Sequence, residues 1–537
     1  MKRRDFLCGG LAIGAGLAAA PFLTGDARAQ KGRASVIRIL SEDTPNTFDP
    51  AGTGYNTAAV NITWNVYDRL VTFGRKPIPG EPGAFIYDYH NITGQAAERY
   101  EVSPDGRSIT FYMRKGATFH DGSPVTAHDV KWSLDRAVNV PTARAQLASG
   151  SLRSPDQFVV IDDMTIRVDT PRLDRFTLPN LAIVFPAIIN SKLAKQHATD
   201  SDPWAQEWLK TNTAGGGPFR LARYQSGQQY VLERNMDWKN GEIVSESPVM
   251  LQVVPVASSR RASAQRGEAD IVRSLSGRDI ESLLAGGKTR VLGVPNPNGV
   301  TFIAMNSQVA PFDNPKVRQA IAWATPYRAL FEAVLYKRGR PLFGGKAETD
   351  SIEWPTPFPY DTDLGKAKAL LAEAGYPDGF ETVFSVDSGD ATLSEPIAIL
   401  MQESLGKIGV RVRIDKVPAG QMGSLQANKK LAMFIGLGNA WLGDPDYYFR
   451  TFYQGPSRWN YGNFMNPEME RLAAETRFET DRAAYEARVK RMIEIAKAEA
   501  PMIPLWSPFQ DSVLGPKLTG YTYMFHNATE MRHLRKE

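Results

Sequence analysis

The sequence has almost no cysteine, little net charge and no long hydrophobic run beyond its N-terminal segment. Cys8 is the only cysteine in 537 residues. A chain without further thiols cannot build a disulfide framework or hold an iron–sulfur cluster through cysteine ligands. The 63 basic and 58 acidic side chains leave a formal net charge of +5, and the basic ones are dispersed. This distribution argues against a nucleic-acid-binding surface.

The histidines also lack the spacing of a metal site. No two of the six stand four residues apart, the spacing that places two imidazoles on one helix face; they are His90, His120, His128, His197, His526 and His533. We therefore predict no tightly held metal ion and no cofactor. Capture of a metal chelate as a ligand stays open. We expect His120, which precedes a Gly/Pro turn, to be a structural turn residue.

The motifs of common enzyme classes are incomplete. No Gly-x-Gly-x-x-Gly follows a predicted strand, so there is no dinucleotide fingerprint. Gly287, Lys288 and Thr289 match the end of a phosphate loop, but Ser282 stands where its first glycine is needed. Residues 404–407 fit Ser-x-x-Lys, yet no Lys-Thr-Gly follows them. We therefore expect a binding protein and not an enzyme, with an exported enzyme as the alternative.

The first 29 residues are typical of an export signal. They contain the pair Arg3 and Arg4, a Gly- and Ala-rich apolar stretch at 11–20, and Ala-Arg-Ala ending at Ala29. This pattern predicts a twin-arginine signal peptide, cleaved near Ala29, and a periplasmic mature chain. A membrane anchor is the alternative, but the stretch falls short of the roughly 20 residues that a transmembrane helix needs. Lipid attachment at Cys8 is a second alternative, which conflicts with its place before the apolar stretch.

The remaining chain is too long for one core, because single cores stop growing at roughly 250 to 300 residues. Strand-like runs alternate with helical patterns, which predicts an α/β fold. The strand-like runs lie at 36–40, 165–168, 230–233 and 410–414, and two amphipathic helices lie at 395–407 and 484–498. Gly- and Pro-rich segments at 213–218 and 293–299 suit lobe boundaries or hinges; two surface turns are the alternative.

Two helix starts carry local signals. A predicted strand ends at residues 109–113, and residues 114–130 then contain a Gly/Pro turn and a helix opened by Thr126. Thr126 and Asp129 have the spacing of a capping box, although the box proper has Glu or Gln in the second place. Asn314 followed by Pro315 predicts a second capped helix start. The Asn314 side chain can cap the helix, and the N–H that proline lacks would have no hydrogen-bond partner within the helix at this first position.

Together with later segments, residues 114–130 resemble the extracellular solute-binding proteins, family 5, of dipeptide, oligopeptide and nickel ABC importers. The matching segments are Gly-Pro-Phe-Arg-Leu at 217–221, Arg-Asn-Met-Asp-Trp at 234–238, Gly-Glu-Ala-Asp-Ile at 267–271, and residues 311–320 and 367–377. They keep the family's order over essentially the whole mature chain, which a chance motif would not do.

The resemblance implies a type II periplasmic binding protein-like fold, with two lobes joined by hinge crossovers that close over a ligand. An extra lobe is implied because peptide-binding members have one. The first lobe is expected from residues 30–72, 214–296 and 503–537, the extra lobe from 73–213, and the second lobe from 297–502. The protein is then expected to be a monomer that captures a peptide or related small solute. Its partners would be that ligand and the permease subunits in the inner membrane, with no nucleic acid.

The resemblance also suggests a receptor for the ligand's amino group. Trp441 and Asp444 belong to a Trp-x-Gly-Asp segment, whose carboxylate receives that group in dipeptide binders. A carboxylate matched by an ammonium only on closure would make binding selective for charge. A surface turn before Pro445 is the alternative, and the segment is three residues shorter than in the dipeptide type.

Further candidates come from three places. The loop with Thr53, Gly54, Tyr55 and Asn56 resembles one that offers backbone and hydroxyl groups to the ligand, and an ordinary turn before a helix is the alternative.

Trp459 and Tyr461 resemble a loop near the cleft, although core packing explains either residue alone. Asp387 follows the strand after which dipeptide binders place an arginine for the ligand carboxylate, and no basic residue is nearby. We therefore expect either a longer peptide held by its backbone or a non-peptide solute, such as an opine, oligosaccharide, polyamine or metal chelate.

Overall fold

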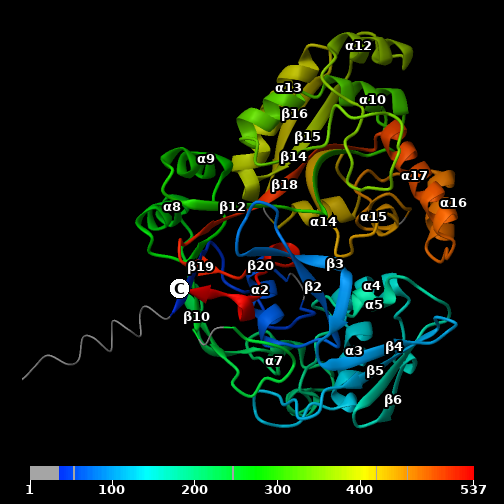
Figure 1. The fold of residues 1–537 in the computed structure, drawn as a ribbon. Coiled ribbons are helices and arrows are strands. Elements are labelled where there is room, and N and C mark those ends of the chain that lie inside the picture. Colours follow the sequence, from blue (N-terminus) through cyan, green and yellow to red (C-terminus); the bar gives the residue numbers. More distant parts are fainter. Residues whose placement is uncertain (1–35, 53–54, 245–246, 419, 456, 537) are drawn as a thin grey trace, which may run out of the picture. The chain divides into compact units, whose positions relative to one another are not determined.

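The computed structural model describes residues 36–52, 55–244, 247–418, 420–455 and 457–536. The predicted signal peptide and the candidates Thr53 and Gly54 lie outside these residues. The chain from Ile37 to Glu537 forms one compact unit, a mixture of helices and several sheets as the sequence predicts (Figure 1). Among the described helices, none is both long and apolar enough to cross a membrane.

The first lobe is built on one half of a long mixed sheet. Its strands follow in the order β18 (Met502–Leu514), β11 (Ile271–Val272), β1 (Ile37–Ser41), β10 (Val249–Val253), β9 (Gln229–Arg234) and β8 (Phe219–Gln225). β1 lies parallel to both β10 and β11, with Ile39 fully buried at its centre. The helices of this lobe are α2 (Thr57–Val66), α8 (Ala257–Arg266) and α9 (Gly277–Gly286). The strands predicted at 36–40 and 230–233 are confirmed.

The second lobe is built on the other half of this sheet. Its order is β16 (Arg411–Val417), β15 (Glu381–Asp387), β17 (Met433–Asn439), β13 (Gly299–Met305) and again β18, with β14 (Gly339–Pro341) also pairing β18. Every residue of β13 is buried, as a central strand requires. The helices are α10 (Pro315–Ala324), α11 (Tyr327–Ala329), α12 (Leu364–Glu373), α13 (Ala391–Gly406), α14 (Met422–Ala427), α15 (Pro445–Phe452), α16 (Pro467–Thr476) and α17 (Arg482–Glu499).

The helix signals of the second lobe behave as predicted. The Asn314 side chain accepts a hydrogen bond from the Lys316 N–H at 2.9 Å, and α10 follows. α13 buries Ile397, Met401 and Leu405 on its core-facing stripe. The predicted stripe is therefore a packing surface.

β18 belongs to both halves of the sheet and connects the lobes. Its first part pairs with β13, where Met502 lies opposite Ala304, and its last part pairs with β12 (Arg290–Pro295). Only residues 296–298 separate β12 from β13, so the chain passes between the lobes twice, along β12–β13 and back along β18 (Figure 1). The Gly/Pro segment 293–299 spans this passage.

The extra lobe contains one small sheet and part of another. The first has the order β4 (Ala97–Val102), β5 (Ser108–Met113), β7 (Thr165–Asp169) and β6 (Phe158–Asp162). The second has the order β2 (Val71–Pro77), β3 (Ala84–Gly94) and β20 (Tyr521–Tyr523), with β3 in the middle. The helices are α3 (Ala127–Asn139), α4 (Pro141–Leu147), α5 (Thr177–Asn180), α6 (Ser191–Lys195) and α7 (Gln206–Leu209). A short ribbon of β19 (Leu518–Thr519) and β21 (Arg535–Lys536) completes the C-terminal segment.

Local signals also position the extra lobe. The Asp129 carboxylate accepts hydrogen bonds from the N–H and the hydroxyl of Thr126, at 3.0 and 2.8 Å, and α3 follows. The ring Nε2 of His120 lies 3.1 Å from the carbonyl oxygen of Gly217. A Cβ on Gly217 would lie 2.6 Å from the carbonyl carbon of Val66, so only glycine fits against the end of α2 at the point that His120 of the extra lobe contacts. His120 is the structural residue that the sequence predicts.

Candidate functional site

A cavity of about 1060 Å³ lies between the first and second lobes. Its first-lobe wall includes Ile39, Ser41, Thr57, Asn61, Tyr230 and Arg273; its second-lobe wall includes Asp390, Thr392, Leu393, Leu437 and Asn439; and the crossovers contribute Asn296, Pro508 and Phe509. The volume is slightly above the roughly 300–1000 Å³ of small-ligand pockets. A neighbouring void of about 10 Å³ shares Asn296, Asn439 and His526 with it and has room for about one water.

Most charged side chains on the cavity wall are paired with each other. Arg260 lies 3.4 Å from Glu42, and Arg261 lies 2.9 Å from Asp279. On the crossover, Arg338 pairs with Asp511 through two nitrogens. These pairs fix the shape of the wall and leave it little net charge.

Arg273 is the buried exception on the first-lobe wall, where Arg278 and Asp43 also have no ion pair among the described residues but are exposed. Its side chain is 4% exposed and donates from Nη1 to Asn61 Oδ1 and to the Asn527 carbonyl, each at 3.0 Å. It also donates to the Thr529 hydroxyl. No described carboxylate pairs with it, so a buried positive charge is held only by neutral acceptors.

Asp390 is the exception on the second-lobe wall. It stands directly before α13, and no ion pair with it occurs among the described residues. Desolvation, followed by the nearby charges of Asp387 and Glu42, raises the pKa of the Asp390 carboxyl to about 6, although the side chain is open to the cavity. Asp387 itself accepts a hydrogen bond from the Gly389 N–H at 2.8 Å. The site candidate Asp387 is thus the neighbour of a cavity-lining acid.

His526 and Asn527 form a strained corner of the cavity. Both have left-handed backbone, with φ of 51° and 61°, a conformation that concentrates at functional sites. Burial lowers the pKa of His526 to about 4, so its ring is neutral at pH 7, and its Nε2 has no partner in the described part of the chain. The ring centroid of Trp441 lies 3.7 Å from that of His526. The candidate Trp441 therefore supports a cavity-lining side chain.

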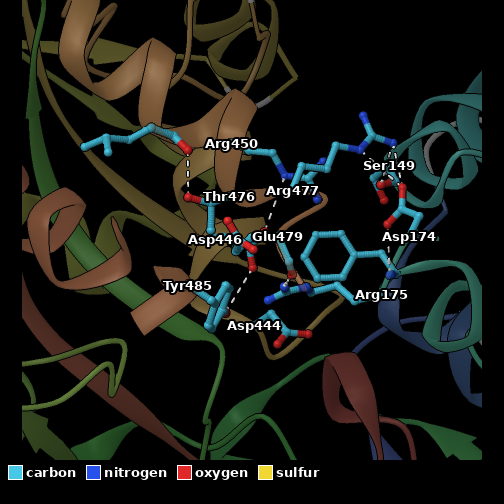
Figure 2. A network of polar contacts seen from close by, with 12 residues as sticks. Ser149, Asp174, Arg175, Asp444, Asp446, Arg450, Thr476, Arg477, Glu479 and Tyr485 are labelled. Atoms are coloured by element: carbon cyan, nitrogen blue, oxygen red, sulfur yellow. Dashed lines mark hydrogen bonds and ion pairs between the residues drawn. The ribbon is translucent and has the colours of Figure 1, made fainter. Parts of the chain in front are cut away.

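Asp444 lines a different cavity, of about 390 Å³, at the junction of the extra and second lobes. Its Oδ2 accepts a hydrogen bond from the Tyr89 hydroxyl at 2.6 Å. Arg175 and Tyr485 lie on the same cavity wall, and the Arg175 guanidinium stacks 3.9 Å from the Tyr485 ring centre. Figure 2 shows Asp444 beside this pair.

The same junction holds a dense polar network (Figure 2). Arg477 of the second lobe donates to Asp174 at 3.0 Å and to the Ser149 carbonyl at 3.1 Å. Asp446 is fully buried and accepts from the Tyr485 hydroxyl at 3.2 Å. Desolvation and the charge of Asp444 raise the pKa of Asp446 to about 7, against the lowering effect of Arg450.

The candidates before α2 are engaged locally. The Asn56 side chain accepts from the Ala59 N–H at 2.9 Å and so caps α2. The Tyr55 hydroxyl is hydrogen-bonded to that of Thr63. Neither residue lines the cavity, but Thr57 and Ala58, which follow directly, do.

Trp459 and Tyr461 lie on the second lobe, away from the three cavities described. Trp459 is 42% exposed, with the Arg458 guanidinium 4.4 Å from its ring centre. Tyr461 packs against Phe302 and Phe452, with ring centroids 5.4 and 5.9 Å away. These contacts place Tyr461 in an aromatic cluster of the second lobe.

Sequence reasoning missed Arg273, Asn61 and the His526–Asn527 corner. The family-like segment 267–271 ends two residues before Arg273 and was the only nearby signal. His526 is a lone histidine with no metal spacing, so nothing distinguished it. In the described part of the chain, no group of three His, Cys, Asp or Glu side chains is arranged to hold a metal ion.

Comparisons with known proteins agree with this architecture. A sequence profile described as bacterial extracellular solute-binding proteins, family 5 Middle, matches residues 91–460. The chain is 27% identical to the probable D,D-dipeptide-binding periplasmic protein DdpA of Escherichia coli, over 89% of this chain and 90% of that one. It is 30% identical to heme-binding protein A of Haemophilus influenzae, over 89% and 88%. The ABC transporter-associated periplasmic binding protein DppA of Helicobacter pylori, solved with the peptide STSA, superposes with a TM-score of 0.77 at 23% identity, covering 95% of this chain and 100% of that one.

Proposed function

Because the chain belongs to family 5 of the bacterial extracellular solute-binding proteins, it is a periplasmic substrate-binding component of an ABC importer, and we propose that the 1060 Å³ cavity captures its solute. The observation that carries this proposal is that both lobes and both crossovers line one cavity. A ligand that touches both walls shifts the population from open to closed. The permease subunits would then recognise the closed form, and the protein acts as a monomeric binder without catalysis.

The lobe boundaries and the export route belong to this proposal. The first lobe would comprise residues 30–72, 214–296 and 503–537, with the extra lobe at 73–213 and the second at 297–502. Export would use the twin-arginine signal, cleaved near Ala29. The mass of the periplasmic form tests the cleavage, and replacing both arginines of the signal by lysine should retain the protein in the cytoplasm.

A peptide is the first candidate ligand. The relatives from Escherichia coli and Helicobacter pylori are named for a dipeptide and solved with a peptide. A non-peptide solute is the second candidate, since heme-binding protein A is similarly related and no arginine follows β15 to hold a dipeptide carboxylate.

The residues predicted from the sequence remain candidates for this site. Thr53, Gly54, Tyr55 and Asn56 precede cavity-lining Thr57, and Asp387 neighbours Asp390. They would shape the rim of the cavity.

The candidates of the second lobe divide into two groups. Trp441 would act through His526, and Asp444 would receive an amino group at the junction cavity. Trp459 and Tyr461 would contribute only if the ligand extends beyond the cavity. Asp444→Asn should then weaken an aminated ligand strongly and a neutral one little; an equal loss for both would remove Asp444 from this role.

Thermal-shift screening of residues 30–537 tests the function. The panel contains peptides of two to eight residues, sugars, opines, polyamines, heme and metal chelates. A ligand at a hundred times its Kd stabilises the native state by about 2.7 kcal/mol. A saturable shift with any class supports solute capture, and a peptide hit supports the first candidate. If no class raises the Tm, and none is retained in equilibrium dialysis, the proposal fails.

A further inference from the structure

Two unpaired charges of opposite sign lie on facing walls of the main cavity. Arg273 belongs to the first lobe and Asp390 to the second, and both line the same space. Of the other arginines on the cavity wall, Arg260, Arg261 and Arg338 are matched by carboxylates. Arg278 has no ion pair among the described residues, but it is exposed, whereas Arg273 is buried. The cavity is therefore nearly neutral as a whole but polar from one lobe to the other.

The Arg273 end is built to hold a positive charge in place. Asn61 and Asn527 accept from the same guanidinium nitrogen, and both also line the cavity. Asn61 in turn donates to the Asn527 carbonyl at 3.3 Å, which ties the two supports together. A buried cation held only by neutral acceptors gains most from an anionic partner, because burying an unpaired charge is costly.

The Asp390 end is built to attract a positive charge. The charges that act on the Asp390 carboxylate are those of Asp387 on its own lobe and Glu42 on the other. Because Glu42 is paired with Arg260, the unneutralised repulsion is that between Asp390 and Asp387, and a cation beside them would relieve it. Asp444, by contrast, already receives the Tyr89 hydroxyl in another cavity.

We propose that the solute is dipolar, with an anionic group directed to Arg273 and a cationic group directed to Asp390, so that each lobe holds one charge. This inference rests on capture in the main cavity and names the ligand chemistry. It also reassigns the amino-group receptor from Asp444, which the sequence favoured, to Asp390. Closure then depends on both ligand charges, because each one contacts a different lobe.

The test measures binding of one peptide with its charges removed in turn. Isothermal titration uses Ser-Thr-Ser-Ala in free, N-acetylated, C-amidated and doubly blocked forms, with maltotriose as an uncharged solute. We expect the free form to bind and each single block to weaken binding about 10- to 100-fold, the effect of one lost charge-assisted contact. Equal binding of the free and doubly blocked forms, or binding of maltotriose alone, overturns the inference.

Variants then assign each charge to its wall. Asp390→Asn should weaken the free peptide and remove the effect of acetylation, while amidation keeps its effect. Asp444→Asn tests the alternative amino-group receptor. Asp378→Asn is the matched control, because Asp378 is an exposed acid of the second lobe outside the cavity. If acetylation loses its effect in Asp444→Asn and not in Asp390→Asn, the assignment to Asp390 is wrong.

Arg273 needs a variant that preserves folding, because it bonds three neighbours. Asn61→Asp keeps the oxygen that accepts from Arg273 and places a carboxylate beside the guanidinium. It should therefore compete with the ligand anion and abolish the effect of amidation. Arg273→Lys keeps the charge and should retain that effect. Undiminished sensitivity to amidation in Asn61→Asp contradicts the proposal.

The outcome in which no form of the peptide binds also tests the proposal. If none of the peptide forms binds while another solute of the thermal-shift panel does, the dipolar assignment fails unless that solute carries both charges, and solute capture stands. If no solute binds at all, solute capture itself has failed, and the dipolar assignment falls with it.

Discussion

The main cavity and the junction between the extra and second lobes use charge in opposite ways. At the junction, Arg477 is satisfied by Asp174 and by backbone carbonyls, and Asp444 by Tyr89. In the main cavity, Arg273 and Asp390 have no ionic partner among the described residues. Matched charges hold two parts of a protein together, whereas unmatched charges at a cavity are available to a ligand. Both regions contain arginines and carboxylates, so composition alone does not separate them.

The largest effect is expected from breaking the junction. Arg477→Ala leaves the Asp174 side chain, which is 0% exposed, without its cation. Removing one partner of a buried pair costs about 3–5 kcal/mol. Urea unfolding should show this loss.

Arg471→Ala is its matched control, in the helix α16 that Arg477 follows directly. Arg471 pairs with Glu475, and both side chains are exposed, by 57% and 40%. Such a surface pair contributes about 0–1 kcal/mol. Equal losses in the two variants would contradict the description of the junction as a buried ionic contact.

The next effect concerns pH at the same junction. The Asp446 carboxyl has a pKa of about 7 in the folded state, above the ordinary 3.8. The native state therefore binds a proton that the unfolded state releases, and the free energy of unfolding falls as pH rises from about 4 to about 7. Each unit by which the pKa is raised contributes about 1.4 kcal/mol to the fall in the free energy of unfolding. Asp446→Asn cannot titrate and therefore lacks this contribution.

Urea midpoints of the wild type and of Asp446→Asn at pH 4, 5.5 and 7 measure the difference. The variant should show the shallower decline. Parallel profiles would mean that Asp446 is ionised in the native state throughout this range.

The smallest expected effect is on the stability of the ligand-free protein, where replacing the unpaired Asp390 should cost less than replacing the hydrogen-bonded Asp444. Asp390→Asn removes repulsion from Asp387 and Glu42, so the free energy of unfolding should stay within about 0.5 kcal/mol or rise. Asp444→Asn replaces a charged acceptor of the Tyr89 hydroxyl by a neutral one and should cost about 1 kcal/mol. Thermal unfolding of both variants without ligand measures the difference. A larger loss of stability in Asp390→Asn than in Asp444→Asn would contradict the prediction.

Much of the fold follows from signals within short segments. Asn314 and Pro315 open α10, and Thr126 with Asp129 opens α3, because capping depends on residues a few positions apart. The stripe on α13 is set by helical periodicity in the same way. The family-like segments then supply the two lobes and the crossovers, which no local pattern contains.

The candidate site could not be derived in this manner. Arg273, Asp390 and His526 come from three distant segments and meet only because the crossovers bring the lobes together. The orientation of Asp444 toward Tyr89 likewise depends on contact between residues 355 positions apart. Sequence spacing carries no information about such contacts, so Asp387 was the closest candidate to a cavity-lining acid.

The shared strand β18 also has a consequence for the order in which the protein is made. It lies at Met502–Leu514, near the end of a chain of 537 residues, and it completes both halves of the long sheet. A ribosome releases the N-terminal parts first, and domains generally fold as they emerge. Here neither main lobe can close its sheet until nearly the whole polypeptide has been synthesised, and a nascent chain stopped before Met502 would leave the edges of β11 and β13 unpaired at once.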